Sequence, residues 1–175
     1  MKENDKNYLT AKEIKILLKS AMGELSHYAI IRLLLNGISL SEIKKLRLKD
    51  IKFQSYQLVL KNPKRKVTIH PATNKSLIDW INHRMNTFRS DKDKIFNIND
   101  RTVRNFIKDY GNVEGINTKC VTQTTLINTF YLITLVLKPE WTVVDFNNHL
   151  GNKSLDYTQE KIEYFKGEIA KYNNA

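Results

Sequence analysis

Two segments of the sequence are apolar on nearly every side of a helix, and they constrain the fold more than any other feature. Residues 25–35 read LSHYAIIRLLL, and residues 124–137 read TTLINTFYLITLVL. A helix that is apolar all round must be buried among other elements. Neither run reaches the roughly 18 apolar residues that suggest a membrane span. The chain is therefore expected to fold as a globular domain around two central helices.

Helix-start signals predict amphipathic helices around these two. Thr10 with Glu13, and Ser39 with Glu42, have the spacing of capping boxes, in which two side chains satisfy backbone N–H groups reciprocally. Pro139 fits the first turn of another helix. The further helices are expected at residues 10–22, 39–46, 77–84, 99–108, 139–150 and 155–172.

Between the first and later helices the apolar period changes from that of a helix to that of a strand. Apolar residues alternate at Ile51, Phe53, Leu58, Leu60, Val67 and Ile69. The segment KNPKRK, residues 61–66, separates two of these runs as a basic hairpin tip, and Pro71 ends the last one. The sequence predicts a mainly α protein with a small three-stranded antiparallel β-sheet (α+β), as a single domain over residues 1–175.

Composition limits the function classes. The 175 residues include 29 Lys and Arg against 18 Asp and Glu, a net charge of +11. Such a positive charge attracts polyanions such as nucleic acids. The alternative is that the excess of lysine only reflects an AT-rich genome, whose codons favour lysine. With a single cysteine, Cys120, and histidines far apart, we expect no disulfide framework, no metal site and no cofactor. The N-terminus lacks an apolar leader, so a cytoplasmic location is expected.

The order of these elements resembles the catalytic domain of the tyrosine recombinases, the phage integrase family. Residues 33–43, LLLNGISLSEI, are similar to the family's leucine run followed by Gly-Leu-Arg-Ile-Ser-Glu-Leu. Residues 8–10 resemble its entry to the domain, residues 126–130 its Leu-Arg-His-Thr-Phe, and residues 150–152 its Leu-Gly-His. The resemblance covers about residues 8–172. Because it begins so near the first residue, we expect the family's N-terminal core-binding domain to be absent.

The resemblance implies a catalytic site whose residues have been replaced. In the family, two arginines clamp the scissile phosphate, a hairpin lysine and two histidine-type positions handle protons or charge, and a tyrosine attacks phosphorus. Arginine suits this role because its planar fork meets two phosphate oxygens at once. The corresponding positions here hold Ser39 and Ile127 for the arginines, Thr124 and Asn152 for the histidines, and Lys161 for the tyrosine. Only the hairpin lysine remains, as Lys61 or Lys64. Tyr164, with Tyr157 behind it, is the best substitute nucleophile.

The residues predicted to contact DNA lie in three basic stretches. They are Lys61, Lys64, Arg65 and Lys66 in the hairpin, Arg101, Arg104 and Lys108 on one helix face, and Lys44 and Arg47 after the first arginine position. For each stretch, the alternative to DNA contact is that the charged side chains are simply exposed to solvent. His149 is interpreted as a surface or helix-end residue, and Cys120 as a small buried one.

The last helix carries a narrow apolar seam. Its members include Ile162, Phe165 and Ile169, spaced alternately three and four residues apart. The seam either packs on its own domain or docks on a neighbour, as the C-terminal segments of the resembling family do.

Three functions follow as hypotheses. The first is a catalytically inactive DNA-binding protein with a regulatory or architectural role in DNA recombination or integration of a mobile element. The second is a partner of an active recombinase, or of a second copy, bound through the last helix. The third is an active recombinase that uses Tyr164.

Overall fold

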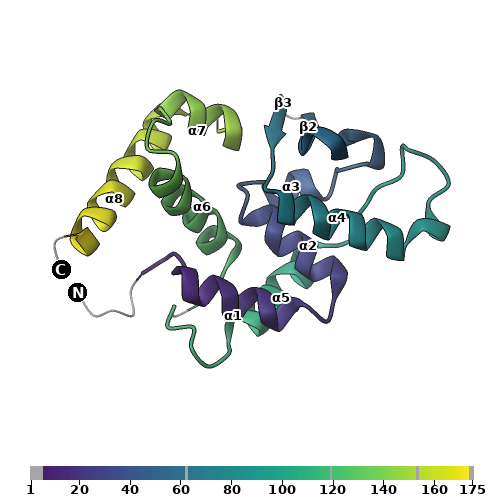
Figure 1. Ribbon diagram of the computed structural model, residues 1–175, viewed down its shortest axis with the longest axis horizontal. Coiled ribbons are helices and arrows are strands. Elements are labelled where there is room, and N and C mark those ends of the chain that lie inside the picture. The colour runs from purple at the N-terminus through teal and green to yellow at the C-terminus, as the bar shows by residue number, and fades with distance from the viewer. Residues whose placement is uncertain (1–5, 62, 119, 153, 174–175) are drawn as a thin grey trace.

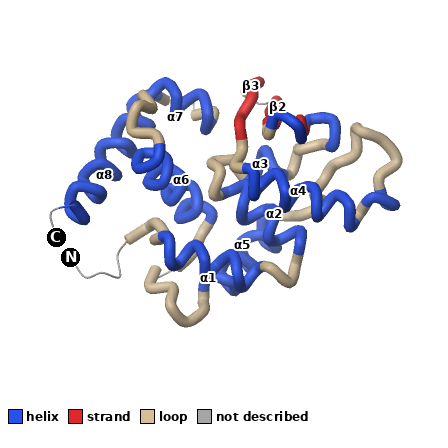
Figure 2. Tube along the Cα trace, in the orientation of Figure 1, coloured by secondary structure: helices blue, strands red, loops and turns tan. Residues whose placement is uncertain are grey.

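The computed structural model describes residues 6–61, 63–118, 120–152 and 154–173. Helices dominate, and the strands form one small patch (Figure 2). The helices are α1 Ala11–Ala21, α2 Leu25–Leu34, α3 Leu40–Ile43, α4 Pro71–His83, α5 Asp100–Gly111, α6 Gln123–Leu137, α7 Val143–Leu150 and α8 Leu155–Asn173, and the strands are β1 Ile51–Lys52, β2 Gln57–Lys61 and β3 Lys64–Thr68. The predicted fold class is confirmed. Within the described part of the chain, no helix is long and apolar enough to cross a membrane.

The three strands form an antiparallel sheet in the order β1-β2-β3. Leu58 pairs with Val67 and Lys61 pairs with Lys64, which places the basic segment at the end of the β2–β3 hairpin. Leu58 and Val67 are buried, and Lys64 and Lys66 are exposed. Because side chains alternate between the two faces of a strand, Arg65 lies on the same face as Val67.

Capping residues fix the helix starts. The predicted boxes of Thr10 with Glu13 and of Ser39 with Glu42 are both present. The predicted start at Pro139 is wrong. Helix α7 begins at Val143 instead, because the hydroxyl of Thr142 accepts from the Asp145 N–H and the Asp145 carboxylate accepts from the Thr142 N–H. This reciprocal cap starts the helix four residues after the proline.

The buried apolar side chains form two clusters. The first core joins α1 to α5 and the sheet, and it also takes in Leu126 from the start of α6. The second core consists of residues of α6, α7 and α8 together with Tyr8. In Figure 1 these three helices stand to one side of the sheet and the first five helices. We call the two parts the first half and the second half.

Helix α8 packs its apolar seam onto its own chain. Phe165 is fully buried, with its ring centroid 5.9 Å from those of both Tyr8 and Tyr131. Ile162 is also buried, and Ile169 is half-buried against the same cluster. Of the two predicted alternatives, this chain shows packing on its own domain, and docking of the seam on a neighbour stays a prediction.

Candidate functional site

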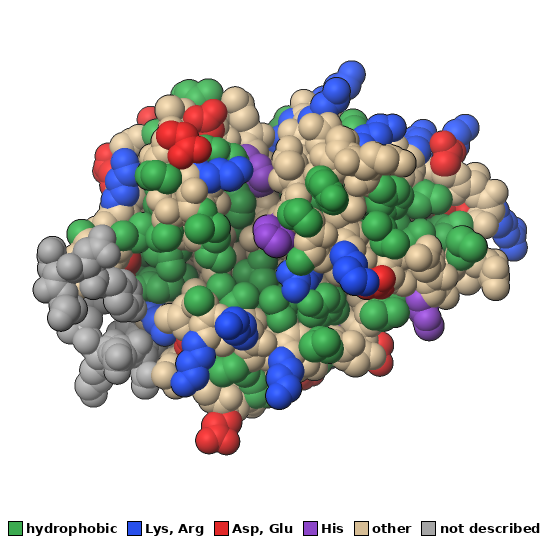
Figure 3. Space-filling model, viewed as in Figure 1, with side chains coloured by type: hydrophobic (Ala, Val, Ile, Leu, Met, Phe, Trp, Pro, Cys, Tyr) green, Lys and Arg blue, Asp and Glu red, His purple; other side chains and the backbone are tan. Residues whose placement is uncertain are grey.

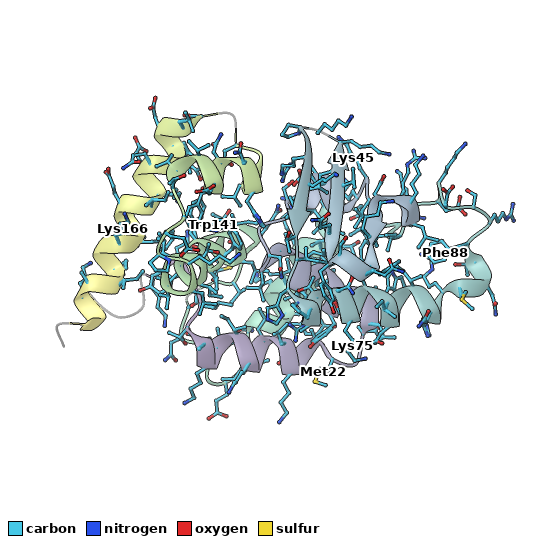
Figure 4. The ribbon with its side chains drawn as sticks, turned by 45° about the horizontal axis from the view of Figure 1, so that its top comes forward. Met22, Lys45, Lys75, Phe88, Trp141 and Lys166 are labelled. Carbon is cyan, nitrogen blue, oxygen red and sulfur yellow. The ribbon has the colours of Figure 1, made fainter. Side chains whose placement is uncertain are left out.

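A cavity of about 520 Å³ lies between α3, the β2–β3 hairpin and the loop after α7. It brings together Ser39, Lys61 and Asn152, which are separated in the sequence and which the resemblance places in one site. Lys45 also lines it, and in Figure 4 this lysine lies beside the strands of the sheet. These contacts make the cavity the candidate site.

Ser39 is used to start α3. Its hydroxyl donates to Glu42 Oε2 at 2.7 Å, and its backbone N–H donates to the same oxygen at 3.0 Å. A serine is short and uncharged, and the hydroxyl of Ser39 is already paired with Glu42. Ser39 therefore cannot replace an arginine as a charged ligand of an anion in the cavity.

Asn152 is part of a hydrogen-bond network in the second half. Its Nδ2 donates to Tyr131 Oη at 3.0 Å and to Thr158 Oγ1 at 2.9 Å. The Thr158 hydroxyl in turn contacts Asn147 Oδ1 at 3.0 Å. Burial raises the pKa of Tyr131, and the bonds from Asn152 and Thr158 oppose that shift. Asn152 thus joins the loop after α7 to α6 and α8.

The remaining positions assigned by the resemblance do not line the cavity. Ile127 packs against the second core, and Thr124 is exposed in the first turn of α6. The ammonium of Lys161 lies 5.7 Å from the ring centroid of Tyr157. The five positions that the resemblance assigns are therefore not assembled into one polar site.

Tyr164 lies outside the cavity in this structure. It is half-exposed, and its ring packs edge-on against Phe165. Burial raises the pKa of Tyr164, and Glu168 adds to the shift. A raised pKa keeps the phenol protonated, which opposes attack on phosphorus. Tyr157 is likewise half-exposed and outside the cavity.

Three lysines of the hairpin are available to solvent. Lys61 lies 3.4 Å from the buried carboxylate of Asp50, and about half of the Lys61 side chain is exposed. Lys64 and Lys66 are exposed and have no ion-pair partner among the described residues. The expectation of a basic tip holds for these lysines.

Arg65 differs from its neighbours, and its placement with them at the tip is corrected. Its side chain is 9% exposed, and it forms an ion pair through Nη1 with Glu42. Its Nε donates to the carbonyl of His149 at 2.9 Å. A Cβ added to Gly151, whose φ is +68°, would lie 2.5 Å from Arg65 Nη1, so the guanidinium needs glycine there. The alternation of Lys64, Arg65, Lys66 and Val67 is the signal that could have predicted this burial.

A second group of cations lies where α3 and α5 meet. Lys44 Nζ bonds Asp100 Oδ1 at 2.7 Å, which places the start of α5 beside the end of α3. Arg47 donates to the carbonyl of Lys92 at 2.9 Å, and Arg104 Nε donates to that of Asp100 at 3.3 Å. Arg101 and Lys108 are exposed on the same helix as Arg104. The three cations of α5 are thus exposed on one helix, and their contact with DNA stays a prediction.

Two minor expectations have different outcomes. His149 lies in the last turn of α7, so the helix-end alternative is confirmed. It is not a free surface residue, because its ring stacks on Phe130 at 4.7 Å and its Nε2 bonds the Asn36 carbonyl at 2.8 Å. Burial lowers the pKa of His149 to about 4, although the Asn36 bond opposes the shift. Cys120 is exposed rather than buried. In the described part of the chain, no cluster of His, Cys, Asp and Glu could hold a metal ion.

Comparisons with known proteins identify the fold. No family model matches the sequence, and no curated protein matches it. Among solved structures, XerA recombinase has a TM-score of 0.80 at 23% identity, over 98% of this chain and 66% of that one. XerH site-specific recombinase, bound to its palindromic difH substrate, has a TM-score of 0.76 at 14% identity, over 95% and 52%.

The catalytic domain of bacteriophage HP1 integrase is also similar, with a TM-score of 0.58 at 16% identity over 90% of this chain and 87% of that domain. The chain spans only about half to two thirds of the XerH and XerA chains, whereas it matches most of the isolated HP1 domain. The chain therefore has the fold of a tyrosine-recombinase catalytic domain.

Proposed function

We propose that this chain binds duplex DNA through phosphate contacts without cleaving it, as a regulatory or architectural factor in recombination or integration of a mobile element. The observation that carries the proposal is the cavity around Ser39, Lys61 and Asn152. It keeps lysines, but none of its described lining residues is Arg, His or Tyr.

The absence of cleavage follows from the chemistry of phosphoryl transfer. The transition state gathers charge on the phosphate oxygens, and removing one donor to such an oxyanion typically costs about 10²–10³ in rate. Here Ser39 and Ile127 stand at both arginine positions, and Lys161 stands at the nucleophile position. With both arginines and the tyrosine replaced, the rate of DNA cleavage should be too low to be useful.

Binding is supported by the charge and by the fold. XerH has the same fold and is bound to DNA in its structure. The net charge of +11 favours a polyanion. In Figure 3, Lys and Arg side chains project along the edge of the molecule that carries the hairpin. Lys64 and Lys66 are the hairpin cations without an ion-pair partner in the described chain.

The test is binding of labelled duplex DNA across a salt series, measured by fluorescence anisotropy. Each phosphate contact contributes about −0.9 to the slope of log K against log salt. The Lys64→Ala/Lys66→Ala variant should therefore bind more weakly and lose about two units of slope. Lys15→Ala/Lys19→Ala, on exposed positions of α1, removes the same charge and should match the wild type. Salt-independent binding, or equal loss in both variants, would contradict the proposal.

The absence of cleavage is tested in the same samples after denaturation in detergent. We expect no covalent protein–DNA adduct. An adduct that disappears in Tyr164→Phe would show that the chain is an enzyme with a relocated nucleophile.

A further inference from the structure

A second cavity, of about 560 Å³, lies between β3 and α7, beside the candidate site. It shares only Pro63, Gly151 and Asn152 with the first cavity. Of the positions that the resemblance assigns to catalysis, Asn152 and Lys64 line this second cavity, and the others do not. We call it the β3–α7 groove.

The groove is positively charged. Its cationic lining residues are Lys64, Arg65, Lys66 and Lys138, and Asp145 is its single carboxylate among the described lining residues. The Asp145 carboxylate already accepts from the backbone N–H of Thr142 at 2.8 Å and from its hydroxyl at 2.6 Å. The excess of cations suits an anionic ligand.

Arg65 offers a donor that nothing on the described chain uses. Its Nη1 and Nε are held by Glu42 and by the His149 carbonyl. Its Nη2 is buried and has no hydrogen-bond partner among the described residues. Buried polar groups are normally paired, so an unpaired one at a cationic groove points to a missing acceptor. A phosphate oxygen is such an acceptor.

The groove also holds an aromatic ring in a fixed orientation. Trp141 packs edge-on against Phe130 at 6.5 Å and against Phe146 at 5.3 Å. Figure 4 shows it between α8 and the sheet. The ammonium of Lys138 lies over its ring, 4.6 Å from the centroid, and the Lys138 side chain is exposed. A flat base can replace this ammonium, because aromatic rings attract both cations and bases.

We infer that the β3–α7 groove binds one unpaired nucleotide of a single-stranded nucleic acid. The base stacks on Trp141 and displaces the ammonium of Lys138. That ammonium and Arg65 Nη2 then bind the phosphate, with Lys64 and Lys66 alongside. The inference goes beyond the proposed function, because a single strand is a different ligand from a duplex. The two ligands share Lys64 and Lys66, and only the single strand uses Trp141 and Lys138.

The first measurement uses fluorescence. The chain has two tryptophans, so Trp80→Phe leaves Trp141 as the only one. Titration of this variant with a short oligothymidylate should quench its emission saturably. Inorganic phosphate at the same phosphate concentration should leave the emission unchanged, since it carries no base. No quenching by the oligonucleotide, or equal quenching by phosphate, would overturn the inference.

The second measurement follows anisotropy of the labelled oligothymidylate with otherwise wild-type protein. Stacking of one base on an aromatic ring is worth enough that Trp141→Leu should weaken binding about tenfold or more. Trp141→Phe keeps an aromatic face and should recover most of the affinity. Lys138→Ala should weaken binding severalfold and reduce the salt slope by about 0.7. Lys19→Ala is the matched control on α1. Equal affinity of all four variants would overturn the inference.

The two proposals fail separately. Both proposals are supported if Trp141→Leu and Lys138→Ala bind duplex DNA as the wild type does but lose binding to oligothymidylate. If the wild type binds oligothymidylate but not duplex DNA, the inference about the groove holds and the proposed function is contradicted.

Discussion

The two halves of the molecule handle the predicted site positions in opposite ways. In the first half, Ser39 and Lys61 still face the cavity. In the second half, Ile127 packs against the core and Lys161 lies over Tyr157, while Asn152 lines the cavity but also bonds Tyr131 and Thr158. The comparison teaches that the second half has put these positions to use in packing and hydrogen bonding. The first half keeps a cationic surface suited to holding a phosphate backbone.

The halves are joined by a few close contacts. Gly37 has a φ of +76°, and a Cβ built there would lie 2.9 Å from Leu150 and 3.0 Å from Phe130. Arg65, from the sheet, binds Glu42 of the first half and the His149 carbonyl of the second. These contacts lie next to both cavities. The geometry of the candidate site therefore depends on how the halves meet.

The largest expected effect comes from emptying the smaller core. Phe165→Ala should reduce the free energy of unfolding by about 3–5 kcal/mol, because the ring is fully buried. Hydrogen exchange should show that protection is lost mainly in α6 to α8. Leu33→Ala, in the first core, should instead lower protection in α2 and around it. A uniform loss of protection in both variants would mean that the halves unfold as one cooperative unit.

A smaller effect is expected where the halves touch. Gly37→Ala should reduce the free energy of unfolding by about 2–4 kcal/mol, because the left-handed backbone strains alanine and its Cβ meets Leu150 and Phe130. Chemical denaturation measures this cost. Gly23→Ala is the control, since a Cβ there meets nothing within 4 Å. A similar small effect at both glycines would show that the contact between the halves is loose.

The smallest effect is a pH dependence that belongs to the second half. The folded pKa of His149 is lowered to about 4 from the ordinary 6.5. Between these values the unfolded chain binds a proton that the folded chain refuses, so stability falls as pH drops from about 6.5 towards about 4. The full difference corresponds to about 3–4 kcal/mol, of which about 2–3 kcal/mol is lost above pH ~4.5.

This dependence is measured by denaturation at several pH values, with emphasis above pH ~4.5, where carboxylates contribute less. His149→Gln should flatten the slope. His27→Gln is the comparison in the first half, where burial also lowers the histidine pKa but Glu24 opposes it. An unchanged slope in His149→Gln would mean that the ring is not held neutral.

Much of the fold could be predicted from local patterns. The capping boxes at Thr10 and Ser39, the hairpin and the buried helices all follow from spacing and period. The predicted start of α7 is wrong, because Pro139 only permits a first turn, whereas the Thr142–Asp145 box makes one. The basic tip was predicted as a unit, although strand alternation separates Arg65 from Lys64 and Lys66.

The sequence by itself determined the class of the fold, the order of its elements and the positive charge. These depend on residue type and on period along the chain, which are local properties. Only the tertiary structure decided that Glu42 is the ion-pair partner of Arg65, that His149 is shielded by Phe130, and that Trp141 lies beside the hairpin. Each of these facts joins residues far apart in sequence. Their burial and charge depend on which surfaces meet, and no local pattern encodes that meeting.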